Sequence, residues 1–191
     1  MPRLPILVLA VLVAASLAAC GRERKEASGL GFQPSSTTTA AAYPRVGMKL
    51  RLPDNAIVRR AAAPGVFRAF IGDGFLSAFA YRRAEQLPRN RREMEAARRR
   101  LERAARQRSP SFKVVRSRST RVGGARAIEL VGDQEVSNAR LRTRSLHVYK
   151  GAAEYVFELG VPVADFERLD SAIFPVLRDT LEVSGKVRGR G

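Results

Sequence analysis

Residues 112–161 read FKVVRSRSTRVGGARAIELVGDQEVSNARLRTRSLHVYKGAAEYVFELGV. Within this stretch, four runs rich in β-branched and aromatic residues are typical of strands: 112–118, 125–131, 141–150 and 153–161. Short glycine-containing turns, Val122-Gly123-Gly124 and Lys150-Gly151, join the first run to the second and the third to the fourth. Because strands joined by such short turns pair antiparallel, the stretch predicts an antiparallel sheet.

The residues before this stretch predict further strands. Residues 48–52 alternate between apolar and basic side chains, as expected of a half-buried strand, and a second short strand begins at Ile57. Two aromatic-rich runs, 67–71 and 75–81, flank Gly72-Asp73-Gly74. This arrangement predicts a hairpin, because a turn containing Asp-Gly adopts positive φ at little cost.

Two helices are predicted around the sheet. Asn90 can cap the start of the first helix, with Glu93 three residues later, and Ser109-Pro110 ends it. Its apolar residues recur at the spacing that lines one face: Met94, Ala97, Leu101, Ala104 and Ala105. The second helix is predicted over 165–180, and its apolar side is formed by Phe166, Leu169, Ile173, Leu177 and Leu181. Pro175 lies inside it, so we expect a kink or a restart there.

The order of the elements defines the fold class. Strands, a helix, about four more strands and a second helix predict an α+β fold, with a curved antiparallel sheet flanked by helices in an α/β/α sandwich. We place this domain at 44–185, about 140 residues, which suits one domain with a single core. The chain has one cysteine, Cys20, so an apolar core rather than a disulfide must hold the fold.

Several motifs resemble those of a known fold when they are taken in order along 44–185. They are an early strand that ends in Leu52-Pro53-Asp54-Asn55, a long polar helix, the strand Phe112-Lys113-Val114-Val115, a Gly123-Gly124-x-x-Ala127 hairpin, an aromatic strand with Tyr155 and Phe157, and a closing helix with Phe174 and Leu177. This layout resembles the PsbP/Mog-type fold (PsbP-like, Mog-like), which is common in bacterial envelope lipoproteins. The chain departs from the pattern at Ala56, where such proteins often carry Trp, and at Pro175 in the last helix. The resemblance implies a non-catalytic binder or assembly factor, and it transfers no site residue by motif.

The first 19 residues are typical of a secretory signal peptide. They combine a basic start, a short apolar run and small residues before a cleavage site. The apolar run, 4–15, is shorter than the roughly 20 apolar residues that a membrane-spanning helix needs. Leu17-Ala18-Ala19-Cys20 resembles the lipobox of bacterial lipoproteins. The resemblance implies cleavage between Ala19 and Cys20, lipidation of the Cys20 thiol with chains such as palmitate, and acylation of the new amino terminus. The alternative is an ordinary signal peptide with an incidental thiol.

The segments beside the domain are polar. Residues 20–43 are predicted to be the lipidated cysteine followed by a flexible tether, because they are small and polar and lack apolar periodicity. Two or three acyl chains on Cys20 would hold the protein firmly in a lipid bilayer, whereas one chain binds only marginally. Residues 186–191 are predicted to be a basic, disordered tail. We therefore expect a lipid-anchored protein on the extracytoplasmic face of the cell membrane.

Basic residues dominate the charge of the chain. Among 191 residues, 35 are Lys or Arg and 18 are Asp or Glu, which gives a formal net charge of +17. Such a charge usually indicates nucleic-acid binding, but an exported protein rarely meets nucleic acid, so we expect no such partner. Anionic lipid or an acidic envelope protein is the more available polyanion. Only five residues are lysines, and this arginine bias is also what GC-rich codon usage produces.

No constellation of residues predicts catalysis, a metal site or a cofactor. His147 is the only histidine, and a single histidine without cysteine partners is weak support for a zinc site. Ser145 lies two residues before it, but no nucleophile elbow surrounds that serine. We therefore interpret His147 as a hydrogen-bonded strand histidine and expect no enzymatic activity.

The arginine-rich helix is the one candidate surface. Arg92, Arg99, Arg103 and Arg106 fall on the face opposite its apolar residues. In one interpretation this face contacts anionic lipid or an acidic partner, where each basic side chain contributes about 1 kcal/mol near an anionic surface. In the other, it is a solvated face supported by i,i+4 pairs such as Glu95–Arg99 and Glu102–Arg106.

Two functions remain open from the sequence. The first is a membrane-anchored cell-envelope lipoprotein that binds, helps to assemble or stabilises another envelope component without catalysis. The alternative is a carrier of a small apolar ligand in a pocket between sheet and helices. Six strand aromatics either line that pocket or fill the core: Phe67, Phe75, Phe79, Tyr81, Tyr155 and Phe157.

Overall fold

The computed structural model describes residues 33–136 and 138–187, and the predicted leader, Ala19 and Cys20 lie outside them. The strands are β1 (Thr38–Tyr43), β2 (Met48–Pro53), β3 (Ile57–Arg60), β4 (Gly65–Ile71), β5 (Gly74–Arg82), β6 (Lys113–Val122), β7 (Ala125–Val136), β8 (Ala139–Lys150), β9 (Ala153–Pro162) and β10 (Glu182–Val183). The helices are α1 (Arg91–Arg108) and α2 (Phe166–Thr180), with short 3-10 turns at Pro44–Val46 and Val163–Asp165. Within the described part of the chain, no helix is both long and apolar enough to cross a bilayer.

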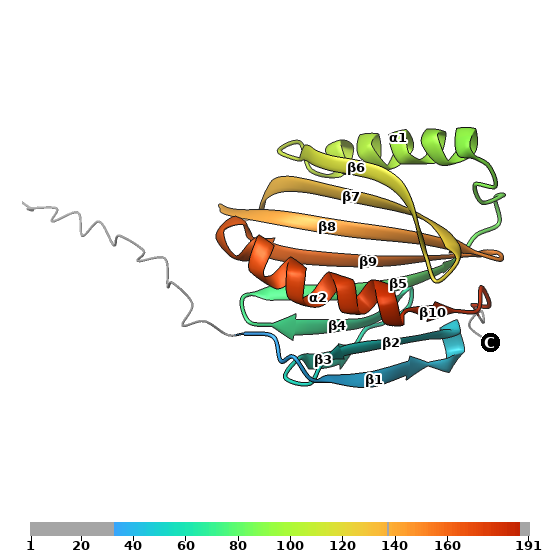
Figure 1. Ribbon diagram of the computed structural model, residues 1–191. Helices are drawn as coiled ribbons and strands as arrows, with labels where there is room; N and C mark the ends of the chain where they lie inside the picture. The colour runs from blue at the N-terminus through green and yellow to red at the C-terminus, as the bar shows by residue number, and fades with distance from the viewer. Residues whose placement is uncertain (1–32, 137, 188–191) are drawn as a thin grey trace, which may run out of the picture.

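The larger sheet confirms the predicted antiparallel pairing. Its seven strands lie in the order β3-β4-β5-β9-β8-β7-β6, and every neighbouring pair is antiparallel. The β6–β7 and β8–β9 hairpins are those predicted from the glycine-containing turns, and β4–β5 is the predicted aromatic hairpin. Figure 1 shows this sheet as a strongly twisted layer between the two helices. The α+β prediction is therefore confirmed.

A second, three-stranded sheet corrects two sequence-based predictions. It has the order β1-β2-β10, so residues 48–52 belong to a separate sheet rather than to the larger one. The predicted tether extended to Tyr43, but Thr38–Tyr43 forms strand β1 and pairs along the whole of β2. The Thr/Ala run lacks apolar periodicity, and its conformation comes from this tertiary pairing. The domain therefore begins before residue 44.

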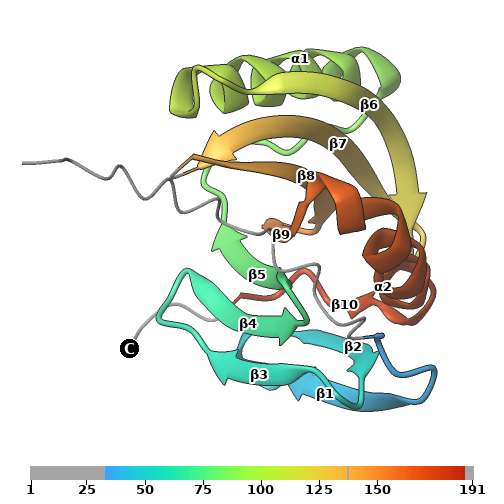
Figure 2. The same cartoon turned by 90° about the vertical axis from the view of Figure 1, so that its left-hand side faces the viewer.

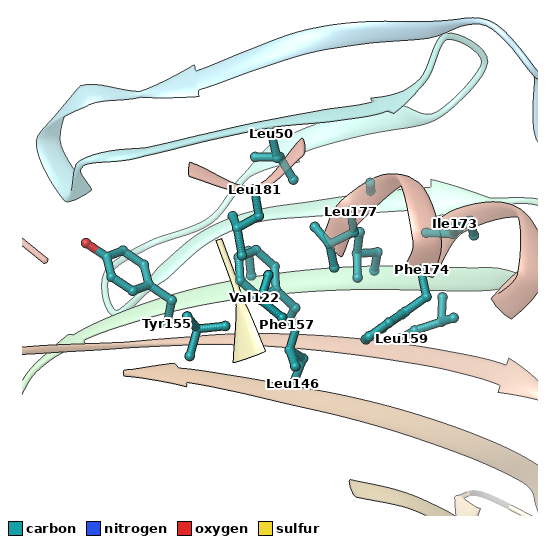
Figure 3. Packing of buried hydrophobic residues seen from close by; sticks show 14 of the residues in the cluster. Leu50, Val122, Leu146, Tyr155, Phe157, Leu159, Ile173, Phe174, Leu177 and Leu181 are labelled. Atoms are coloured by element: carbon teal, nitrogen blue, oxygen red, sulfur yellow. The ribbon is translucent and has the colours of Figure 1, made fainter. Parts of the chain in front are cut away.

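The main core lies between α2 and the inner face of the larger sheet. Phe157, Leu146, Phe174 and Leu177 are fully buried there, as Figure 3 shows. The predicted apolar side of α2 is confirmed, because Phe166, Leu169, Ile173 and Leu177 are all buried. The chain does not restart at Pro175: α2 is continuous, and Pro175 lies on its exposed side. The predicted tail is also shorter than expected, since Val187 packs against this core; 188–191 lie outside the described residues.

A buried ionic cluster ties α2 to the sheet. Arg144 of β8 donates to Asp170 of α2 and to Glu129 of β7, each at 2.6 Å. The Arg144 guanidinium lies 4.0 Å from the centre of the Phe174 ring. Glu129 also accepts from Arg118 at 3.1 Å, and its side chain is fully buried. Burial alone would raise the pKa of Glu129, but the hydrogen bonds and charges of Arg144 and Arg118 outweigh it and hold that pKa below its usual value.

Helix α1 covers only part of the opposite face of the larger sheet, which we call the outer face. Met94 and Ala97 pack on Ile128, and Ala105 packs with Phe112 and Leu130. These contacts place α1 over β6 and β7, as Figures 1 and 2 show. The outer face of β3, β4, β5 and β9 is left without a helix above it.

Candidate functional site

Helix α1 is fixed at its start by the predicted cap. The Asn90 side chain accepts a hydrogen bond from the Glu93 backbone N–H at 2.9 Å. The Glu93 carboxylate accepts from the backbone N–H of Arg89, one residue before the cap, at 2.6 Å. These bonds satisfy amide groups that have no partner inside the helix. With its apolar side held on the sheet, α1 turns its arginines outward.

The four predicted arginines form one exposed surface, which we call the arginine surface: Arg92, Arg99, Arg103 and Arg106. Glu95 lies 3.3 Å from Arg99, which confirms one predicted pair. The other predicted pair is wrong, because Glu102 contacts Arg98 on the side toward β6 instead of Arg106. Within the described residues, no carboxylate lies within 4.0 Å of Arg92, Arg103 or Arg106.

The acidic residues of α1 are therefore spent mainly on one arginine. Arg98 donates to Glu95 at 2.9 Å, to Glu102, and to the Ser117 hydroxyl of β6 at 3.2 Å. The hydrogen bond from Arg98 holds the pKa of Glu95 below its usual value. Since Arg98 takes up these carboxylates, the arginine surface keeps most of its positive charge.

The arginine surface lies far from the point where the chain enters the domain. Figures 1 and 2 both show α1 at one end of the molecule and β1, the first strand, at the other, with the two sheets and α2 between them. A segment that leads into β1 is thus attached at the end opposite to the arginines.

The outer face beside α1 has an ordered arrangement of side chains across the strands. One cross-strand row consists of Ile57, Phe70, Phe75, Gly160, Thr143 and Gly132. The next row consists of Arg59, Arg68, Ser77, Glu158 and Ser145. An aromatic row therefore runs beside a polar row. Tyr81, Phe79 and Phe75 lie half-buried on this face, whereas Phe67, Tyr155 and Phe157 fill the main core.

Two hollows lie on the outer face. One, of about 280 Å³, lies between the end of α1 and the sheet and is lined by Phe75, Phe112, Arg108, Glu158 and Ser145 among others. The other, of about 360 Å³, lies over β3, β4 and β5 and is lined by Arg59, Arg68, Phe70 and Phe79 among others. Both combine aromatic walls with charged groups.

His147 is held as the sequence predicted for a strand histidine. Its Nδ1 lies 2.7 Å from Oε1 of Glu154, and Arg83 donates to the other oxygen of that carboxylate at 2.6 Å. Burial would raise the pKa of Glu154, but His147 and Arg83 hold it below its usual value. Ser145 and Glu158 line the hollow beside α1, but His147 is not among the residues around it. The described residues contain no group of three or more His, Cys, Asp or Glu side chains that could hold a metal ion.

Sequence reasoning missed the basic and aromatic residues of β3 and β4. Ile57 was predicted to begin a strand, and Phe70 was placed in a hairpin, but neither was predicted to lie at a sheet edge. The available signal was the alternation of Ile57 with Arg59 and of Arg68 with Phe70 along adjacent strands, since period-two spacing places such residues on one face. Cys20 and Ala19 lie outside the described residues.

Comparisons with known proteins show similarity of fold. No protein-family model matches the chain, and no curated protein is similar to it in sequence. Its structure is similar to the cyanobacterial PsbP (CyanoP) of Synechocystis sp. PCC 6803, with a TM-score of 0.60 and 12% identity, covering 87% of this chain and 98% of that one. It is also similar to LpqN of Mycobacterium tuberculosis, described as involved in cell envelope biogenesis, with a TM-score of 0.57 and 14% identity, covering 78% of this chain and 91% of that one. The chain therefore has the PsbP-like α+β fold.

Proposed function

We propose that the protein is a cell-envelope lipoprotein, held on the extracytoplasmic face of the membrane through acylated Cys20, and that its domain is a non-catalytic binding or assembly factor for another envelope component. The anchor is supported by the signal-peptide pattern and by the lipobox-like Leu17-Ala18-Ala19-Cys20. The envelope role is supported by the fold shared with LpqN, whose description names cell envelope biogenesis.

The arginine surface is the observation that carries the binding role. Arg92, Arg103 and Arg106 are exposed and have no carboxylate within ion-pair distance in the described part of the chain. Lone guanidinium groups on one helix face attract acidic groups and steer an acidic partner toward that face.

The position of this surface favours an acidic protein over the anchoring bilayer. The chain enters the domain at β1, and α1 lies at the opposite end of the molecule (Figure 1). With the anchor attached beyond β1, the arginine surface points away from the membrane that holds the protein. An acidic envelope protein can approach it there without any rotation of the domain.

The alternative of an apolar-ligand carrier has less support. The residues that face one another between the larger sheet and α2, such as Phe157, Leu159 and Phe174, are fully buried and in contact. The hollow beside α1 carries Arg108, Glu158 and Ser145 on its walls, and desolvating these groups would oppose the binding of an apolar ligand.

Chemical crosslinking in intact cells tests the proposed function. The native lipoprotein and its Cys20→Ser variant are crosslinked, purified and compared by mass spectrometry. We expect one envelope protein to be recovered in stoichiometric amount with the native form and to be depleted with Cys20→Ser, because the unanchored chain is no longer held at its partner. Recovery of lipid or a small molecule without any stoichiometric protein would contradict the binding role.

A further inference from the structure

Strand β3 is an unpaired edge of the larger sheet. Among the described strands it pairs with β4 and with no other, and all four of its residues are exposed. Ile57 is 63% exposed and Val58 is 44% exposed. An edge of this kind presents backbone N–H and C=O groups that can pair with another extended chain.

The outer face next to this edge is apolar and hollowed. Ile57 lies opposite Phe70, and Phe70 lies opposite Phe75 on the next strand. Phe70 is 39% exposed, although it is a large aromatic residue. The hollow of about 360 Å³ opens beside it, between β3 and Phe79 of β5. A large apolar side chain of a bound segment would find aromatic contacts here.

The same surface carries unneutralised arginines. No carboxylate of the described residues lies within 4.0 Å of Arg59, Arg60 or Arg68, in contrast to Arg98 on α1. The Arg59 guanidinium lies 5.8 Å from the Phe70 ring centre, and that of Arg68 lies 5.3 Å from the Phe75 ring centre. Stacking on the rings restrains both groups. A restrained guanidinium can receive a carboxylate through two parallel hydrogen bonds.

We propose that β3 and the outer face of β4 and β5 bind an extended, acidic segment of a partner protein. The segment adds as a strand to the free edge of β3, places carboxylates against Arg59 and Arg68, and places an apolar side chain beside Phe70. Main-chain hydrogen bonds give such strand addition its affinity, and side-chain pockets give it specificity. This inference rests on the proposed binding function and names the chemistry of the partner.

Charge and exposure exclude simpler explanations of this edge. Arginines alone protect an edge strand from aggregation, but a protected edge does not also expose Ile57, Val58 and Phe70. A second copy of this chain that paired β3 with β3 would bring Arg59 and Arg60 of the two copies together. Like charges placed opposite each other destabilise a strand pair, so an acidic segment is the better match.

Photo-crosslinking of the full lipoprotein in intact cells tests this proposal. A Phe70→p-benzoyl-phenylalanine form places the reactive group on the surface, and a Val115→p-benzoyl-phenylalanine form is the matched control. Val115 is 52% exposed on β6, the opposite edge of the same sheet. We expect position 70, and not position 115, to crosslink to a protein, and mass spectrometry to place the crosslink in a segment rich in Asp and Glu. Yield from position 70 should fall about tenfold with Arg59→Glu/Arg68→Glu.

Each other outcome overturns the inference. Crosslinks to lipid, to a second copy of this chain, to a basic or neutral segment, or to no molecule would contradict it, as would a yield that charge reversal leaves unchanged. A paired Arg92→Glu/Arg103→Glu variant distinguishes the two proposals. If that variant loses the partner found by chemical crosslinking while position 70 gives no acidic product, the proposed function holds and this inference fails.

Discussion

Arg144 of β8 and Asp170 of α2 form a 2.6 Å ion pair inside the domain, with their side chains only 8% and 12% exposed. The pair joins the sheet to the helix that closes the main core. Removing one member leaves the other charge buried, at a cost that reaches about 3–5 kcal/mol. Since Arg144 retains Glu129, Asp170→Ala should lower the free energy of unfolding by about 3 kcal/mol.

Urea unfolding followed by circular dichroism measures this loss. The matched control is Asp165→Ala, which removes a pair with Arg168 at the same distance class, 2.7 Å, but with both side chains about one-third exposed. The control should cost about 0–1 kcal/mol, because exposed ion pairs contribute little. Equal losses in the two variants would show that burial of the Arg144–Asp170 pair has no particular importance.

The buried Glu129 predicts a loss of stability in acid. Its pKa is held below the model value of 4.5 by Arg144 and Arg118, which outweigh its burial. A carboxyl with a lowered pKa contributes stability above its unfolded pKa, and that contribution is lost as pH falls through the folded pKa. The unfolding free energy of the wild type should therefore fall between pH 7 and pH 3 by more than that of Glu129→Gln. Parallel pH profiles for the two proteins would refute this role.

The ring of Phe112 lies where a side chain at position 132 would lie. A Cβ added to Gly132 would overlap the ring, so Gly132→Ala should destabilise the domain by about 1–3 kcal/mol through overpacking. A double-mutant cycle with Phe112→Ala checks the cause. With the small side chain at position 112, the added cost of Gly132→Ala should disappear. An unchanged cost would place the strain in the backbone of β7 instead.

The anchor predicts a change in cellular location. Cys20→Ser removes the thiol that would carry the acyl chains, and the domain has no described membrane-spanning helix to replace them. The variant should move from the membrane fraction to the soluble fraction, and intact mass should lose the acyl increment. A variant that stays in the membrane fraction after a high-salt wash would contradict lipid anchoring.

The cap of α1 predicts a modest effect with a clear control. Asn90→Ala removes the acceptor for the Glu93 amide and should destabilise the protein by about 1 kcal/mol. Asn90→Asp keeps an acceptor at the same place, so it should cost much less. Thermal denaturation of the two variants measures the difference, and equal melting temperatures would argue against capping by this side chain.

Local patterns in the sequence predicted most of the larger sheet and both helices. The β6–β7 and β8–β9 hairpins and the apolar sides of α1 and α2 follow from short-range periodicity and from turn residues. Strand β1 was missed because its Thr/Ala run acquires its conformation only by pairing with β2, twelve or fewer residues away but in a separate sheet.

The candidate sites divide in the same way. Arg92, Arg99, Arg103 and Arg106 were found because helical spacing alone places them on one face. Arg59, Arg68 and Phe70 were not found, because their meeting depends on the strand order β3-β4-β5, which short-range periodicity does not contain. The same holds for Arg144 and Asp170, which are 26 residues apart and meet only across the core.

The central claim is that the arginine surface of α1 holds an acidic envelope protein. Its most direct test is quantitative recovery of the crosslinked partner with Arg92→Glu/Arg103→Glu, compared with Arg45→Glu/Arg126→Glu, which changes net charge equally at exposed sites elsewhere. The account predicts that recovery falls about tenfold with the α1 variant and stays near the wild-type level with the control. Equal recovery from both variants, or equal loss from both, would contradict it.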